Sequence, residues 1–132
     1  MFFVFPVIFY AVFIYYLSSF KGGLPAIGVK LSDKVLHIIE FFILGWLTAR
    51  AIHFGSMESI SKKLLLISII SGILYGASDE IHQLFVLGRS SEWLDWFADC
   101  IGVVLGVIVY RRYYKIESKS FGFPKDPKKL KD

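Results

Sequence analysis

The residues with the clearest chemical potential lie between Ser78 and Ser90, at the end of a long apolar stretch. This segment contains two carboxylates, an imidazole, a carboxamide and a guanidinium, which belong to Asp79, Glu80, His82, Gln83 and Arg89. Ionisable groups at membrane depth cost about 2.5 to 3.5 kcal/mol each on insertion scales. They are therefore rare there and usually mark function, so we expect a ligand-binding or reactive site in this part of the chain.

Two other segments carry polar residues at helical spacing. Asp33, His37 and Glu40 recur at i, i+4 and i+7, which keeps them within an arc of roughly 60° on a helix. Asp95 and Asp99 are spaced i, i+4, and their face continues with small residues at Gly102 and Gly106. Such a small-xxx-small pattern is typical of closely packed helices in membranes. The sequence thus predicts polar side chains above a region of close helix packing.

Composition indicates an integral membrane protein. Of the 132 residues 55% are hydrophobic, whereas about 45–50% is usual in soluble domains. Residues 111–132 hold eight of the 15 Lys and Arg and three of the 11 Asp and Glu, so the first 110 residues carry a net charge of minus one. The basic character therefore belongs to the tail, and no nucleic-acid partner is expected. Cys100 is the only cysteine, which excludes an intramolecular disulfide and a Cys-based metal site.

The hydrophobic pattern predicts an all-α fold, a four-helix transmembrane bundle with short loops. The expected helices cover residues 1–20, 34–51, 64–85 and 93–113. The first is expected to remain uncleaved because Leu17-Ser18-Ser19 is a poor match to a signal-peptidase site. Ser32 or Asp33 is expected to cap the second helix. Residues 1–113 then form the transmembrane domain, and residues 114–132 form a basic, flexible cytoplasmic tail that can contact anionic lipid.

Lys and Arg predict the orientation of the bundle. With four spans, one side holds Arg50, Lys62, Lys63 and the eight cations of the tail, eleven in all, against four on the other side. Both termini should therefore be cytoplasmic, in a protein that crosses the cell membrane several times. The polar ends of the second, third and fourth helices then meet on the extracytoplasmic side. We expect His37, Asp79 and Asp95 to lie around one shared pocket, with Arg89 reaching over it.

At these residues the sequence resembles the VanZ-like family of small bacterial membrane proteins, over about residues 5–110. The family's pattern opens one helix with Asp-Lys-x-x-His and an acidic residue one turn later, here Asp33-Lys34-Val35-Leu36-His37 and Glu40. It ends another with Asp-Glu-x-x-Gln followed by Gly-Arg, here Asp79-Glu80-Ile81-His82-Gln83 and Gly88-Arg89. Its last block is an Asp in a helix that continues to Gly-x-x-x-Gly, here Asp95 and Gly102 to Gly106.

Two positions depart from that pattern: Leu87 stands where a Pro is common, and Asp99 where an Asn is common. The second change adds a negative charge and raises the demand for a proton or cation in the site. The family is named for a component associated with resistance to the lipoglycopeptide teicoplanin. The resemblance implies a four-helix membrane protein of the cell envelope, with membrane lipids as neighbours, and supplies no reaction.

The residue types themselves favour a pocket that binds or modifies an amphiphilic envelope ligand, such as a lipid-linked saccharide or a lipoglycopeptide. His37 or His82 would act as general base, with Asp33 or Asp79 fixing its tautomer, because a neutral imidazole can take a proton near pH 7. Arg89 would hold a phosphate or carboxylate through its fork of donors. The other expected ligand-binding residues are Gln83, Glu80, Asp95 and Asp99.

Two alternatives remain open at the level of sequence, as does the question of whether the protein is an enzyme. The first is a divalent metal site, less favoured than a proton-sharing network, with candidate ligands Asp33, His37, Glu40, Asp79 and His82. The second is a non-enzymatic assembly or transport factor whose buried ions only fix helix packing.

Overall fold

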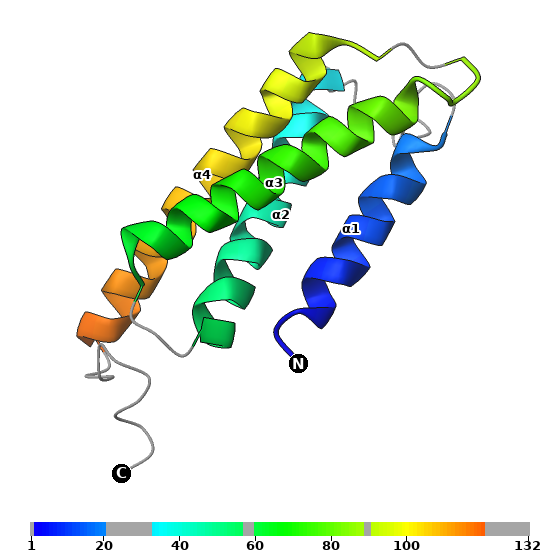
Figure 1. Ribbon diagram of the computed structural model, residues 1–132. Helices are drawn as coiled ribbons and strands as arrows, with labels where there is room; N and C mark the ends of the chain where they lie inside the picture. Colours follow the sequence, from blue (N-terminus) through cyan, green and yellow to red (C-terminus); the bar gives the residue numbers. More distant parts are fainter. Residues whose placement is uncertain (1, 21–32, 57–59, 89–90, 121–132) are drawn as a thin grey trace.

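The described residues of the protein fold into α-helices. The computed structural model describes residues 2–20, 33–56, 60–88 and 91–120, and these residues contain four helices and no strand. The helices are α1 (Phe5–Ser18), α2 (Asp33–Ser56), α3 (Lys62–Gln83) and α4 (Trp93–Ser120), as shown in Figure 1. The predicted all-α, four-helix class is confirmed.

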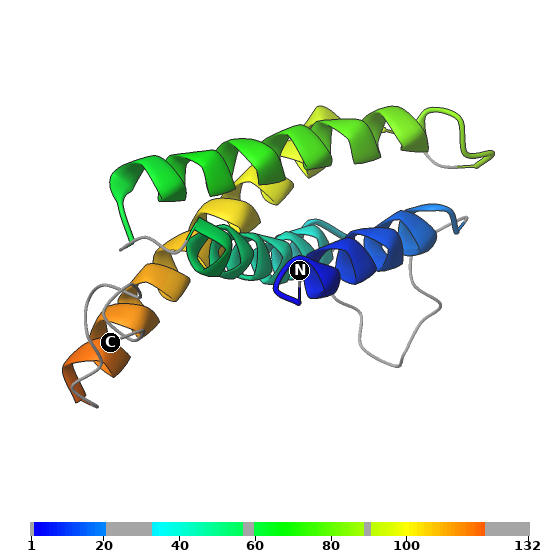
Figure 2. The same ribbon diagram turned by 60° about the horizontal axis from the view of Figure 1, so that its bottom comes forward.

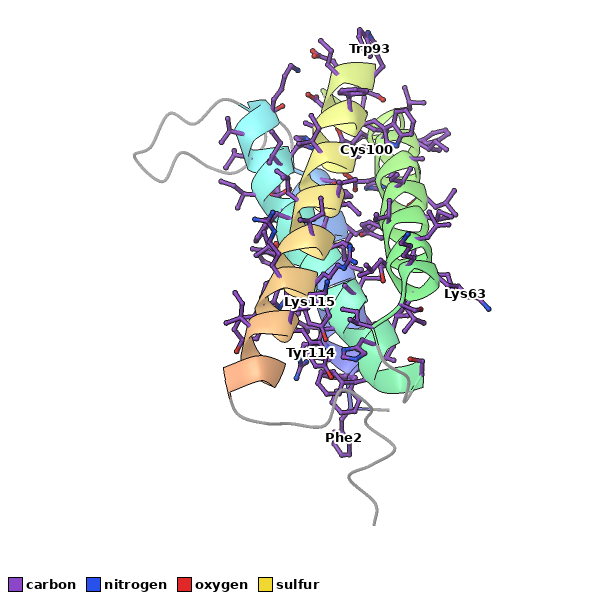
Figure 3. All side chains as sticks on the ribbon, turned by 90° about the vertical axis from the view of Figure 1, so that its left-hand side faces the viewer. Phe2, Lys63, Trp93, Cys100, Tyr114 and Lys115 are labelled. Carbon is purple, nitrogen blue, oxygen red and sulfur yellow. The ribbon has the colours of Figure 1, made fainter. Side chains whose placement is uncertain are left out.

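Four helix ends meet at one end of the bundle. Ser18 is the last residue of α1, and its hydroxyl donates to the carboxylate of Asp79, near the C-terminal end of α3. The ammonium of Lys34, at the start of α2, lies 2.7 Å from Asp95 Oδ1, at the start of α4. We call this the polar end. Figure 3 shows Trp93 at this end of the bundle and Phe2 and Tyr114 toward the other.

Aromatic and basic residues gather at the opposite end. Phe3 stacks on Phe54, the last turn of α2, with ring centroids 5.0 Å apart. The Arg50 guanidinium lies 5.7 Å from the centroids of both rings. Because α1 begins where α2 ends, consecutive helices run in alternating directions (Figure 1). The chain therefore enters α1 and leaves α4 at the same end, the one opposite the polar end.

The closest packing joins α2 to α4 through glycines. A Cβ added at Gly102 would lie 2.5 Å from the carbonyl oxygen of Ile38, and one at Gly106 would lie 2.1 Å from that of Phe42. From the other side, a Cβ at Gly45 would lie 2.5 Å from the carbonyl oxygen of Val103. Each distance is too short for any side chain, so glycine is what lets the two backbones approach. The packing role expected for Gly102 and Gly106 is confirmed.

Helix α1 lies at the side of the bundle. Figure 1 shows α1 and α4 on opposite sides, and Figure 2 shows α3 lying across one face above α2 and α1. The hydroxyl of Tyr75 on α3 donates to the carbonyl oxygen of Ala11 at 2.6 Å, and Ile14 is fully buried against α2 and α3. The remaining face of α1 exposes large apolar side chains, including Phe5, Phe9 and Tyr16. Apolar surface of this extent is typical of contact with lipid.

Three helices, α2, α3 and α4, are long and apolar enough to cross a membrane by length and composition. Helix α1 has 14 residues, roughly 21 Å of helix against a hydrocarbon core of about 30 Å. The sequence predicts a helix of 20 residues here. The observed helix is shorter because residues 2–4 form turns and residues 19–20 lie beyond its end at Ser18. Pro6 occupies the first turn, where its missing N–H costs least.

The other helix ends also differ from prediction. Helix α2 runs to Ser56 rather than about Ala51, and α4 runs to Ser120 rather than about Tyr113. Helix α4 continues into polar sequence because residues 114–120 contain Lys and Glu, which are good helix formers. Residues 52–56 of α2 contain no Lys, Arg or Glu, and there the bond from His53 to Tyr110 joins the extension to α4. Helix α3 begins at Lys62, two residues early, with Ser61 Oγ accepting the amide of Leu64, and it ends at Gln83 instead of about Phe85.

The connection after α3 contains a backbone conformation that favours glycine. Gly88 has φ 85°, in the left-handed region. The amides of Phe85 and Val86 donate three residues back, to the carbonyls of His82 and Gln83, which closes α3 tightly before the turn. The chain therefore turns at residues 84–88, directly after α3. The predicted cap at Ser32 lies outside the described residues, as do the rest of the first loop and the end of the tail.

Candidate functional site

The centre of the polar end is a buried histidine–aspartate pair. His37, one turn into α2, faces Asp99 of α4, with His37 Nδ1 2.8 Å from Asp99 Oδ1. Both side chains are buried, and Asp99 has no exposed surface. When Asp99 is ionised its carboxylate only accepts, and the proton of this contact then lies on Nδ1. A carboxylate that holds Nδ1–H fixes the ring orientation and leaves Nε2 as the chemically available nitrogen.

A second carboxylate of α3 points into the same region. Glu80 is buried and accepts a hydrogen bond from the hydroxyl of Ser91 at 2.7 Å. Donor atoms of His37, Glu80 and Asp99 all lie within 4.8 Å of one another. Helices α2, α3 and α4 each contribute one of the three. Glu80, an expected ligand-binding residue, therefore faces α2 and α4.

Asp79, the neighbour of Glu80, faces α1 instead. Its carboxylate accepts from the hydroxyl of Ser18 and, at 2.9 Å, from the amide nitrogen of Gln83. Asp79 and Gln83 are both buried. Consecutive residues of a helix point about 100° apart, so Asp79 and Glu80 contact different neighbouring helices.

His82 completes the α1 side of the polar end. Its Nε2 lies 3.1 Å from the hydroxyl oxygen of Ser19, and its ring stacks on Tyr15 with centroids 4.1 Å apart. The Ser19 hydroxyl donates to the carbonyl of Tyr15 at 2.8 Å, so it accepts from His82. In this arrangement His82 does not activate Ser19 as a nucleophile.

The rim of the polar end carries an exposed ion-pair network. Lys34 bridges Asp95 at 2.7 Å and Glu92 at 3.0 Å. Its side chain is 41% exposed, whereas that of Asp95 is 4% exposed, so the lysine neutralises a buried carboxylate from the water side. Donor atoms of Asp33, His37 and Asp95 also lie within 4.8 Å of one another, with Asp33 exposed. His37 thus belongs to two sets of donors. We call Asp33, His37 and Asp95 the outer set, and His37, Glu80 and Asp99 the inner set.

The structure divides the predicted site residues into two neighbouring groups. The group between α2, α3 and α4 consists of Asp33, His37, Glu80, Asp95 and Asp99. The group between α1 and α3 consists of Asp79, His82 and Gln83. Of the sequence-based metal candidates, Asp33 and His37 share a set of converging donors, whereas Glu40, Asp79 and His82 belong to no such set among the described residues. Arg89 lies outside the described residues.

Sequence reasoning missed several partners of these groups. Ser18, Lys34 and Ser91 each bond a buried carboxylate, but Ser and Lys near helix ends are common and carry no distinguishing signal. It also missed a buried polar pair at the opposite end, where His53 Nδ1 lies 2.7 Å from the hydroxyl of Tyr110. His53 falls beyond the predicted end of its helix, and the extension of α2 is what brings it to α4.

Comparison with known proteins gives a family match. A family model described as VanZ/LLP1 matches residues 3–114. An uncharacterised protein of Schizosaccharomyces pombe (strain 972 / ATCC 24843), C11E3.10, is 28% identical over 101 residues. That match covers 75% of this chain and 59% of the yeast protein, so the chain spans about three fifths of its relative's length. No solved structure matches.

Proposed function

The chain belongs to the VanZ/LLP1 family, and from this premise we propose that it is a multi-pass protein of the cell membrane whose polar end binds the headgroup of an amphiphilic envelope ligand. The favoured ligand classes are an acylated glycopeptide of the teicoplanin type and a lipid-linked saccharide. His37, held by Asp99, is the residue that exchanges a proton with the bound headgroup. The pairing of these two buried side chains, 2.8 Å apart, is the observation that carries the proposal.

The depth of the polar groups supports a headgroup ligand. His37 is the fifth residue of α2 and Asp99 the seventh of α4, so they lie roughly 6 to 9 Å inside the helix ends. A helix as long as α2, with 24 residues, extends roughly 36 Å and exceeds a hydrocarbon core of about 30 Å. The polar groups therefore sit at the boundary between acyl chains and headgroups. An amphiphile could place its polar part there while its acyl chain remains in lipid.

Charge distribution supports an extracytoplasmic position for the polar end. Arg50, Lys62 and Lys63 lie at or near the opposite end, where α2 finishes and α3 begins, and Figure 3 shows Lys63 directed away from the bundle. Cytoplasmic segments are enriched in Lys and Arg. Both termini are then cytoplasmic, and the polar end faces the compartment where envelope glycopeptides act. Arg89, from the sequence, is the residue assigned to hold a phosphate or carboxylate of the ligand.

The test uses teicoplanin as the probe. The protein in lipid nanodiscs is titrated with teicoplanin and with its deacylated form, and the recovered glycopeptide is analysed by mass spectrometry for a chemical change. We expect acyl-dependent binding that weakens at least tenfold in His37→Gln and in Arg89→Gln. Ser71→Ala, an exposed hydroxyl in mid-α3, is the matched control and should bind as the wild type does. Binding that is equal in the wild type and both site variants would refute the proposal.

The second candidate is a packing role for the same residues. Most polar groups at this end bond one another, as in the Ser18–Asp79–Gln83 set. Buried polar networks of this kind can fix helix register without binding anything. In that case Asp79→Asn should lower the resistance to unfolding while leaving teicoplanin susceptibility of an expressing bacterial host unchanged.

A further inference from the structure

Among the described residues, two buried carboxylate oxygens at the polar end have no hydrogen-bond partner. They are Oε1 of Glu80 and Oδ2 of Asp99, in side chains that are 7% and 0% exposed. The other oxygen of each carboxylate is bonded, to Ser91 in one case and to His37 in the other. A bare carboxylate oxygen away from water is costly unless a proton or a cation satisfies it. These two oxygens therefore require a positively charged partner other than the described side chains that surround them.

The two carboxylates converge on one place. A Cβ built at Gly76 of α3 would lie 3.3 Å from Asp99 Oδ2, so the bare oxygen of Asp99 faces α3. Glu80 lies one helical turn beyond Gly76 on the same face of α3. Donor atoms of Glu80, Asp99 and His37 lie within 4.8 Å of one another, which is the spacing of ligands around one small ion. The absence of a side chain at Gly76 keeps this approach open.

We propose that His37, Glu80 and Asp99 bind one divalent transition-metal ion, with zinc as the best match. One imidazole and two carboxylates are ligands that zinc accepts, and three protein ligands leave a coordination position open. Two negative charges and a neutral imidazole balance a divalent ion. His37 Nδ1 and Asp99 Oδ1 lie 2.8 Å apart, so the ion would take the place of the proton between them, with Nδ1 as the ligand atom of the imidazole.

The inner set fits a cation better than the outer one. Asp95 of the outer set is already neutralised by Lys34, and the lysine charge would repel an ion placed beside it. Asp33 is exposed and loses little by remaining in water. In the described part of the chain, neither Glu80 nor Asp99 bonds a Lys or Arg. The cation therefore belongs between α2, α3 and α4.

The test measures metal and not activity. Tag-free, full-length protein in nanodiscs is treated with EDTA, titrated with ZnCl2, desalted and analysed for bound zinc, and cobalt(II) replaces zinc for absorption spectra. We expect about one zinc per chain. We expect at least a tenfold loss of zinc affinity in Glu80→Gln and Asp99→Asn, since removal of even an outer-sphere partner costs roughly 10- to 100-fold. His82→Gln and Asp33→Asn are matched controls and should keep the wild-type affinity.

The possible results separate the explanations. Wild-type protein that retains no zinc or cobalt overturns the site and leaves shared protons as the partner of the two carboxylates. Zinc lost in Asp33→Asn but kept in Glu80→Gln also overturns it, because the ion would then belong to the outer set. If a variant loses its helical circular dichroism, Glu80→Asp replaces it, and its cobalt spectrum must differ from that of the wild type.

This inference deepens the proposed function, since His37 serves both, and the two can fail separately. Teicoplanin binding is measured on the same EDTA-treated and zinc-loaded samples. Teicoplanin binding without any zinc retention overturns the metal site alone. Zinc retention without teicoplanin binding overturns the ligand proposal alone.

Discussion

Gly106 of α4 lies so close to α2 that one methyl group would collide with backbone. In Gly106→Ala the new Cβ would lie 2.1 Å from the carbonyl oxygen of Phe42 and 2.9 Å from the amide nitrogen of Trp46. Real Cβ contacts are essentially never under 3.0 Å, so the helices must separate by about 0.9 Å, the difference between 3.0 and 2.1 Å. No side-chain rotation can relieve a clash with the main chain.

The cost follows from two opposing terms. Overpacking costs about 1 to 3 kcal/mol, and the upper end applies because the obstacle is backbone, whereas alanine regains about 1 kcal/mol of helix propensity. We therefore expect Gly106→Ala to lower the free energy of unfolding by about 2 kcal/mol. Gly55→Ala is the matched control. Gly55 lies in the last turn of α2, and no neighbouring atom of the described residues lies within 4 Å of its new Cβ, so the change should be neutral or slightly stabilising.

The assay is unfolding of the purified protein in mixed micelles by increasing mole fraction of dodecyl sulfate, followed by far-ultraviolet circular dichroism. The wild type, Gly106→Ala and Gly55→Ala are compared at equal protein and lipid concentration. If Gly106→Ala unfolds at the same dodecyl sulfate fraction as Gly55→Ala, the close approach of α2 and α4 is wrong. The arrangement of the polar end depends on that approach and would then also be wrong.

Three further outcomes are expected. Tyr110→Phe should lower the free energy of unfolding by about 1 to 3 kcal/mol because it deprives buried His53 of its hydrogen-bond partner. Adding His53→Leu should restore much of this loss. If the losses of the two single variants simply add in the double variant, measured in the same unfolding assay, the pairing is wrong. Gly88→Ala should cost about 1 to 2 kcal/mol, measured likewise, because φ 85° is strained for alanine; an unchanged stability would argue against this turn. In a Cys100→Ser background, Lys128→Cys should resist a membrane-impermeant thiol reagent applied to intact cells and react after permeabilisation, since the Lys and Arg distribution predicts a cytoplasmic tail; labelling of intact cells would move the polar end to the cytoplasmic side.

The helical spacing of the polar residues was enough to predict that distant segments meet. The sequence places Asp33 and His37 at the start of one helix, Asp79 and Glu80 at the end of the next, and Asp99 near the start of the last. In an alternating bundle those positions necessarily lie at one end. The bonds from His37 to Asp99 and from Lys34 to Asp95 agree with that expectation.

By itself, the sequence determined the all-helical class, the number of helices, the membrane character and the end of the bundle where polar groups collect, because these follow from local composition and spacing. Only the tertiary structure decided that Glu80 turns toward His37 and Asp99 while Asp79 turns toward Ser18. In a membrane protein the lipid-facing and core-facing side chains are both apolar, so hydrophobic periodicity does not fix how a helix is rotated. The rotation is set instead by where backbones can touch, at Gly45, Gly102 and Gly106, and that contact depends on two helices at once.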